Sequence, residues 1–225
     1  MKRVLLSVTI ILSLFLTSCL KDNDYVQTYV ELGNLIGEDI NDFQVETDYY
    51  NILKPQGNFY SDGFKFKKNG RVIIQYSIVE GNDEKKEYKV NVNAIENIFE
   101  KKLVFLGVEG ADTLKKDPLS MVGAWIGKEY LNIEFNFRSS GSSKKPHYFD
   151  LVYDSTKQNV DNHLALDLTH NAQEDIYSPY HYKVIMTVPL DELKVPEQDS
   201  INIWLRTNDE LYEPKTITYR YNIDK

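Results

Sequence analysis

Histidine, asparagine and aspartate residues lie around one predicted turn near residue 172, and their side chains could do chemistry there. His170, Asn171 and Asp175 flank the turn, and imidazole, amide and carboxylate groups commonly bind ions and small ligands. The alternative is structural, with Asn171 capping the turn and His170 hydrogen-bonded to backbone across a sheet. The candidates for ligand contact are His147, His170, Asn171 and Asp175.

The spacing of the histidines does not predict a metal site. His147, His163, His170 and His181 include no His-Glu-x-x-His pair, although neighbouring strands could bring two of them together. The sequence also has no Asp-x-Asp-x-Asp-Gly calcium loop. We therefore expect neither a metal nor a cofactor.

Sequence motifs for catalysis are also missing. There is no Gly-x-Ser-x-Gly elbow, and the glycine-rich segment 123–128 is one residue short of a phosphate-binding loop and is followed by Glu129. The 34 carboxylates guarantee accidental pairs, so a glycosidase dyad cannot be recognised. We expect no catalytic residues and no enzymatic activity; a surface hydrolase of glycans or peptides is the enzymatic alternative.

The single cysteine follows an N-terminal segment typical of exported proteins. A short basic start and an apolar run at residues 4–16, too short for a bilayer core of about 30 Å, predict a signal peptide over residues 1–18. Leu-Thr-Ser-Cys at residues 16–19 resembles a bacterial lipobox, in which the cysteine thiol and the freed amine are acylated. More than one acyl chain gives stable anchoring. We predict lipidation at Cys19; the alternative is a secreted protein with a stray cysteine.

The residues after Cys19 concern the destination of the protein. Lys21, Asp22 and Asp24 resemble a surface-export signal of bacterial lipoproteins, although a plain polar tether over residues 19–33 would have a similar composition. We expect an outer-membrane protein at the cell surface, with the periplasmic face of that membrane as the alternative.

The charge balance excludes one class of partner. The 225 residues contain 26 Lys and Arg against 34 Asp and Glu, a formal net charge of −8. Removal of residues 1–18 takes away two basic and no acidic residues, which leaves −10. Nucleic-acid phosphates select basic surfaces, so we expect no nucleic-acid partner.

Alternating apolar and polar residues predict strands along the whole mature chain. In the first half, alternation occurs at residues 43–49 and 88–92, and a run of β-branched residues predicts a strand at 71–79. A short helix at 94–102 and a strand at 103–108 follow. In the second half, similar runs occur at residues 131–137, 148–153, 164–168, 182–188, 201–205 and 217–223. The expected class is all-β, with a small barrel over residues 34–112 and an antiparallel β-sandwich over 113–225.

Several motifs carry a resemblance to a known family. Asn69-Gly70-Arg71-Val72, Trp125-Ile126-Gly127, the segment 130–135 and the segment 168–172 with Asp175 resemble NigD-like lipoproteins. The resemblance implies an OB-type barrel followed by a β-sandwich on a lipid anchor, and no catalytic residues. We expect a module that binds an envelope or extracellular partner, with a bacteriocin-associated accessory or immunity lipoprotein as the alternative.

Two further features concern the surface. Three Asp-Ser/Thr triplets resemble a bacterial O-glycosylation signal, and their alternative is three acidic turns; the candidate residues are Thr113, Ser155 and Ser200. The 16 tyrosines could form a platform for a glycan or peptide, although tyrosine also suits half-exposed strands. A membrane, reached through the lipid anchor, and a glycan, peptide or protein are therefore the expected partners.

Overall fold

The computed structural model describes residues 26–57, 63–107, 114–142, 144–158, 163–175, 179–191, 200–207 and 215–220. Their regular elements are strands and one short 3-10 helix, η2 (Ser155–Lys157), which confirms the all-β class. The described part of the chain contains no helix with the length and apolar character that crossing a bilayer requires. The predicted signal peptide, Cys19 and Thr113 lie outside the described residues.

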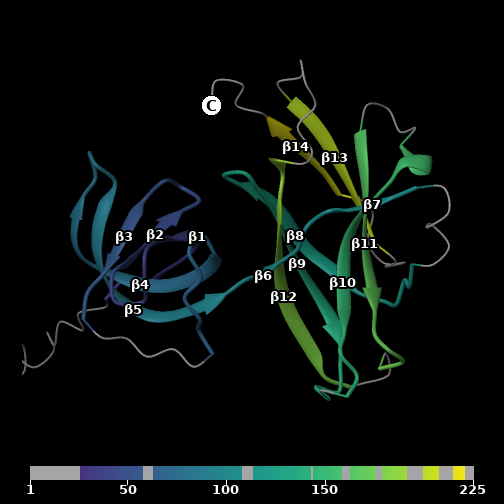
Figure 1. Ribbon diagram of the computed structural model, residues 1–225, viewed down its shortest axis with the longest axis horizontal. Helices are drawn as coiled ribbons and strands as arrows, with labels where there is room; N and C mark the ends of the chain where they lie inside the picture. The colour runs from purple at the N-terminus through teal and green to yellow at the C-terminus, as the bar shows by residue number, and fades with distance from the viewer. Residues whose placement is uncertain are drawn as a thin grey trace, which may run out of the picture.

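The first five strands close into a barrel, at the left of Figure 1. The strand order is β1-β2-β3-β5-β4, with β3 beside β5 in parallel and the other pairs antiparallel. Alternation fills the interior: Phe43, Val45 and Thr47 are buried, and the residues between them are half-exposed. The strands are β1 (Tyr29–Gly37), β2 (Phe43–Thr47), β3 (Ile52–Pro55), β4 (Arg71–Asn82) and β5 (Glu87–Asn97).

The helix expected at residues 94–102 is wrong, because this stretch is extended. Ile95 lies on β5 opposite Ile74 of β4, and both side chains are fully buried in the barrel core. Phe99 lies on the next strand and pairs with Met186. The helical spacing of the apolar residues reflects two strands of different sheets that follow each other in sequence, with no helical face.

The remaining strands form two sheets packed face to face, at the right of Figure 1. One sheet has the order β14-β13-β11-β10-β7, and the other has the order β6-β12-β9-β8. Their inner faces share one core that includes Met121, Phe135, Leu151, Leu166 and Met186. The strands are β6 (Phe99–Glu100), β7 (Val104–Leu106), β8 (Ser120–Gly127), β9 (Tyr130–Arg138), β10 (Tyr148–Asp154), β11 (His163–Asn171), β12 (His181–Pro189), β13 (Ser200–Arg206) and β14 (Lys215–Arg220).

The border between the two units lies earlier than the sequence analysis places it. The barrel begins at Tyr29, inside the predicted tether 19–33, and its last strand ends at Asn97. The strands β6 and β7 already pair with β12 and β10 of the sandwich. Residues 99–106 therefore belong to the sandwich, and the predicted ranges 34–112 and 113–225 need correction.

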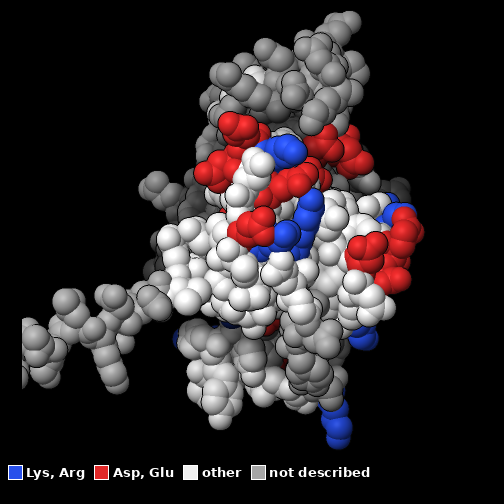
Figure 2. Space-filling view, turned by 90° about the vertical axis from the view of Figure 1, so that its left-hand side faces the viewer, with Lys and Arg blue, Asp and Glu red and all other residues white. Residues whose placement is uncertain are grey.

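On the face of the barrel that points away from the sandwich, acidic and basic side chains gather together in the upper part, as Figure 2 shows. Lys54 pairs with Glu87 at 2.6 Å, and Lys89 pairs with Glu80 at 2.7 Å. These side chains are between 39% and 68% exposed, so water screens both pairs and they add little to stability.

Candidate functional site

A buried arginine lies where the barrel meets the sandwich. Arg71 is the first residue of β4, and its side chain has no exposed surface. Its two terminal nitrogens donate to the two carboxylate oxygens of Asp48, at 2.6 and 2.8 Å, and one also donates to Asn34 Oδ1 at 3.1 Å. Such a bidentate pair fixes the plane of the guanidinium group.

The same arginine reaches across to the sandwich. It donates to Asn132 Oδ1 on β9 at 3.1 Å, and its guanidinium carbon lies 4.3 Å from the centre of the Tyr130 ring. Thr187 of β12 donates to the same Asn132 oxygen at 2.9 Å. We call this set the junction network; its members are Asn34, Asp48, Arg71, Tyr130, Asn132 and Thr187.

The turn between β8 and β9 closes the junction from the side of the sandwich. A Cβ atom at Gly127 would lie 1.9 Å from Asp48 Oδ2, so only glycine fits there. The next residue, Lys128, has a positive φ of 51°, pairs with Glu46 of the barrel at 2.6 Å and lies 5.2 Å from the centre of the Tyr50 ring. This turn therefore holds the barrel through its backbone shape and through its lysine.

The second group of polar residues lies at one end of the sandwich and contains three of the four predicted ligand contacts. His147 Nδ1 lies 2.8 Å from His170 Nε2, and His147 Nε2 lies 3.3 Å from Asp175 Oδ2. Asp175 Oδ2 also accepts from the backbone N–H of Ser140 at 2.7 Å and from its hydroxyl at 2.8 Å. We call His147, His170, Asp175, Ser139 and Ser140 the histidine cluster.

Burial and hydrogen bonding shift the pKa values in the histidine cluster in a consistent way. The backbone N–H of Ser140, then its hydroxyl, lower the pKa of Asp175 to about 2 by stabilising the carboxylate. Burial lowers the pKa of His170, although its contact with the Pro118 carbonyl acts in the opposite direction. Asp175 is therefore ionised at neutral pH, and His170 favours the neutral form.

Asn171 does not join the cluster. Its Oδ1 accepts from the backbone N–H of Gln173 at 3.1 Å, and so it caps the turn. His170 Nδ1 lies 3.0 Å from the Pro118 carbonyl. Both contacts are those of the structural alternative, and ligand contact by these residues stays a prediction. Within the described ranges, no three His, Cys, Asp or Glu side chains are arranged to hold a metal ion.

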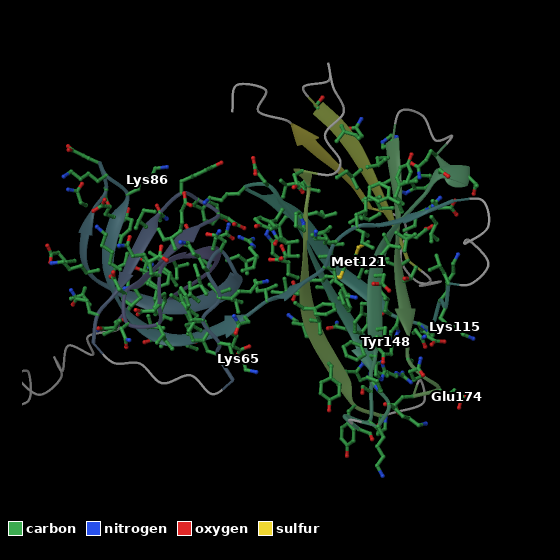
Figure 3. The ribbon with its side chains drawn as sticks, in the orientation of Figure 1. Lys65, Lys86, Lys115, Met121, Tyr148 and Glu174 are labelled. Carbon is green, nitrogen blue, oxygen red and sulfur yellow. The ribbon has the colours of Figure 1, made fainter. Side chains whose placement is uncertain are left out.

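Exposed tyrosines lie at the same end of the sandwich. Tyr148, labelled in Figure 3, is 50% exposed and lies opposite Asn171 on the neighbouring strand. Tyr182 is 42% exposed and stacks on Phe137 at 5.8 Å between ring centres. Tyr180 is also exposed, and its carbonyl accepts from the backbone of Ser139. Tyr148, Tyr180 and Tyr182 thus lie at the same end of the sandwich as the histidine cluster, and the Tyr182 ring reaches the cluster through Phe137.

The structure describes two of the three predicted glycosylation residues. Ser155 is exposed at the start of η2, where the neighbouring Asp154 caps the turn by accepting from Thr156 N–H at 3.0 Å. Ser200 is half-buried at the start of β13, opposite Arg220. Ser155 is therefore the more accessible of the two, and glycosylation at Thr113, Ser155 and Ser200 stays a prediction.

Comparison with known proteins places this architecture in a family. The family described as the NigD-like C-terminal beta sandwich domain matches residues 102–221. The chain belongs to the NigD-like family. None of the curated proteins matches the chain.

Solved structures extend the likeness over both units of this NigD-like protein. A protein of unknown function from Bacteroides vulgatus has a TM-score of 0.69 at 16% identity, over 88% of this chain and 92% of its own. A NigD-like immunity protein from Bacteroides caccae has a TM-score of 0.63 at 19% identity, over 88% of this chain and 98% of its own. A candidate lipoprotein from Bacteroides fragilis has a TM-score of 0.61 at 11% identity, over 88% and 100%. The TM-scores show a shared fold, and at identities this low the likeness shows the fold alone.

The junction network was not predicted from the sequence. Arg71 and Asn132 both lie in motifs that resemble the family, but the motifs alone assign them no contact. One signal was available: Arg71 opens a run of β-branched residues that predicts a buried strand, and an arginine in such a place needs a buried partner. The identity of that partner, Asp48, has no local signature.

Proposed function

We propose that this NigD-like protein is a lipid-anchored, non-enzymatic lipoprotein of the outer membrane that presents its two β units as one body to an envelope or extracellular partner. The junction network is the observation that supports presentation of the two units as one body. The terminal nitrogens of Arg71 have all their partners only when Asn34 and Asp48 of the barrel and Asn132 of the sandwich are in place, whereas its buried Nε has no hydrogen-bond partner among the described residues. A buried charge with partners from both units favours one relative orientation over others.

The packing of both interiors supports recognition on the outer surface. Apolar side chains fill the barrel, among them Leu35, Val45 and Ile74, and the sandwich has its own continuous core. A glycan, peptide or protein would then meet surface side chains, and exposed tyrosines offer rigid amphipathic contacts of the required kind. The net charge of −10 on the mature chain argues against a nucleic acid.

Binding through the exposed tyrosines is tested by substitution of Tyr148 and Tyr182 by alanine. We expect the double variant to bind glycans or cell-surface extracts, chosen because the mature wild type binds them, with an affinity tenfold or more lower. The reason is that each ring supplies contact area at low entropic cost. Tyr49, 71% exposed on the barrel, is the matched control, and Tyr49→Ala should bind as the wild type does. Equal binding by all three proteins on a glycan array and in surface cross-linking would contradict this surface.

The lipid anchor is tested at Cys19. Cys19→Ser removes the thiol that would take the lipid, so we expect the protein to move almost completely from the membrane fraction to the soluble fraction. Ser18→Ala, which keeps a small residue before the cysteine, should leave the protein in the membrane. Retention of Cys19→Ser in membranes would sink the lipoprotein assignment. Protease treatment of intact cells separates the cell surface from the periplasmic face.

A second candidate is a bacteriocin-associated immunity or accessory role. It is favoured by the structural likeness, over both units, to a protein described as a NigD-like immunity protein. The test is the survival of cells that lack the gene when they are exposed to bacteriocin-producing neighbours. Sensitivity that is rescued by wild type, but not by Cys19→Ser, supports immunity at the membrane. Unchanged survival against producers that kill other strains of the species would reject it.

A further inference from the structure

The two imidazole rings of the histidine cluster lie in a row between two groups that only accept hydrogen bonds. At one end, the Pro118 carbonyl oxygen lies 3.0 Å from His170 Nδ1. In the middle, His170 Nε2 lies 2.8 Å from His147 Nδ1, and at the far end His147 Nε2 lies 3.3 Å from Asp175 Oδ2. All four ring nitrogens are therefore committed to three contacts.

The number of protons decides whether this row is satisfied. Each of the three contacts needs one N–H proton, because a carbonyl, a carboxylate and an unprotonated ring nitrogen are all acceptors. Two neutral imidazoles carry only two such protons. With two protons, one contact must set a lone pair against a lone pair, in a place where His147 and His170 are 6% and 2% exposed.

We propose that the His147–His170 pair is a buried binding site for one additional proton. This proton stabilises the contacts among the loops at this end of the sandwich. With three protons, each contact has one donor and one acceptor. The positive charge on the pair then matches the negative charge of Asp175, so the cluster as a whole is neutral.

The surroundings indicate which ring carries the additional proton. Asp175 stays ionised, because Ser140 supplies two hydrogen bonds and lowers its pKa to about 2. Burial lowers the pKa of His170, so this ring remains neutral with its proton on Nδ1, facing Pro118. The charge therefore lies on His147, in contact with the Asp175 carboxylate.

The other groups around the two rings come from four elements. Asp117, in the segment before β8, accepts from the Ala172 N–H at 2.7 Å, and its negative charge acts to raise the pKa of His170, against the larger effect of burial. Lys116 lies beside His170 in the backbone bridge. The rings that pack on the histidines from β9 and β10 are Phe137 and Phe149, which carry no charge, and Tyr182 of β12 lies behind Phe137.

The proton has structural consequences because Asp175 also holds a neighbouring loop. Asp175 accepts from Ser139 and Ser140, which follow β9, while His147 precedes β10. Loss of the proton removes the positive charge beside Asp175 and leaves one of the three contacts without a donor, which weakens the anchoring of Asp175 and so its hold on this loop. A Cβ atom on Gly141 would lie 2.7 Å from the Tyr182 hydroxyl oxygen, so the loop borders this exposed tyrosine. Figure 3 shows Tyr148 and Glu174 at this end.

The experiment is an NMR titration of the imidazole nitrogens of the full mature protein between pH 8 and pH 5. We expect the pair to take up one proton, on His147, while His170 keeps its proton on Nδ1 throughout. Asp175→Asn should lower the proton affinity of the pair tenfold or more, because it removes the adjacent charge. His163 and His181, which lie outside the row, should titrate unchanged in this variant.

Amide hydrogen exchange gives a second readout, whose main measurement is made on the wild type. After correction for intrinsic exchange, we expect protection of the Ser140 amide to fall about tenfold or more between pH 5.5 and pH 8 in the wild type, since the stabilising proton is bound at low pH and lost as pH rises. His147→Gln should remove this pH dependence, and His181→Gln should keep it. Independent titration of the two rings, or a pair that stays neutral at pH 5, would overturn the proposal.

Discussion

Replacement of Arg71 by methionine is expected to destabilise the protein by about 3–5 kcal/mol, because it leaves the Asp48 carboxylate buried without its partner. Asp48 is 8% exposed and receives both of its short hydrogen bonds from Arg71. In a chain of this length, such a loss lowers the melting temperature by roughly 6–20 °C. Calorimetry also tests the coupling of the two units: one wild-type transition should separate into two in the variant.

Two companion variants distinguish this mechanism from the general loss of a charge. Lys89→Met breaks the exposed pair with Glu80 and should cost about 0–1 kcal/mol. Arg71→Met combined with Asp48→Leu removes both buried charges, so it should be more stable than Arg71→Met alone. A double variant as unstable as the sum of the two single ones would contradict the explanation by an uncompensated carboxylate.

Replacement of Gly127 by alanine has the second largest expected effect, although it adds only one methyl group. The new Cβ would lie 1.9 Å from Asp48 Oδ2 and 2.6 Å from its Cγ, so the carboxylate must move. Its position is set by two hydrogen bonds from Arg71, and a shift weakens both. We expect a loss of about 2–3 kcal/mol, within the range for overpacked sites, measured by urea unfolding.

Gly123 provides a matched control on the same strand, β8. A Cβ at Gly123 meets nothing within 4 Å, so Gly123→Ala should change stability by no more than about 0.5 kcal/mol. Introduced into the Arg71→Met, Asp48→Leu background, Gly127→Ala should cost less than in the wild type, because the paired carboxylate is gone. Equal costs for Gly127→Ala in both backgrounds would show that the clash, and not the junction network, determines the effect.

Local patterns were enough to predict the fold class and most strands of this NigD-like protein. Residues 131–137 alternate as predicted and lie in β9, and the predicted strands 71–79 and 88–92 lie within β4 and β5. Such patterns report which face of a strand is buried, because side chains alternate with a period of two. Helical periodicity misled at residues 94–102, where the helical spacing arose from Ile95 and Phe99 on strands of different sheets.

The two polar groups depended on tertiary structure. Arg71 meets Asn132 across 61 positions in sequence, and His147 meets His170 across 23, because closure of the barrel and pairing of β10 with β11 set those registers. The sequence by itself determined the succession of alternating strands and the net charge, and it carries the prediction of lipidation at Cys19. These features depend on short segments or on composition. Which buried charge has which partner, and how many protons the histidine pair needs, were decided only by the tertiary structure, because hydrogen bonds depend on atomic distances that periodicity does not contain.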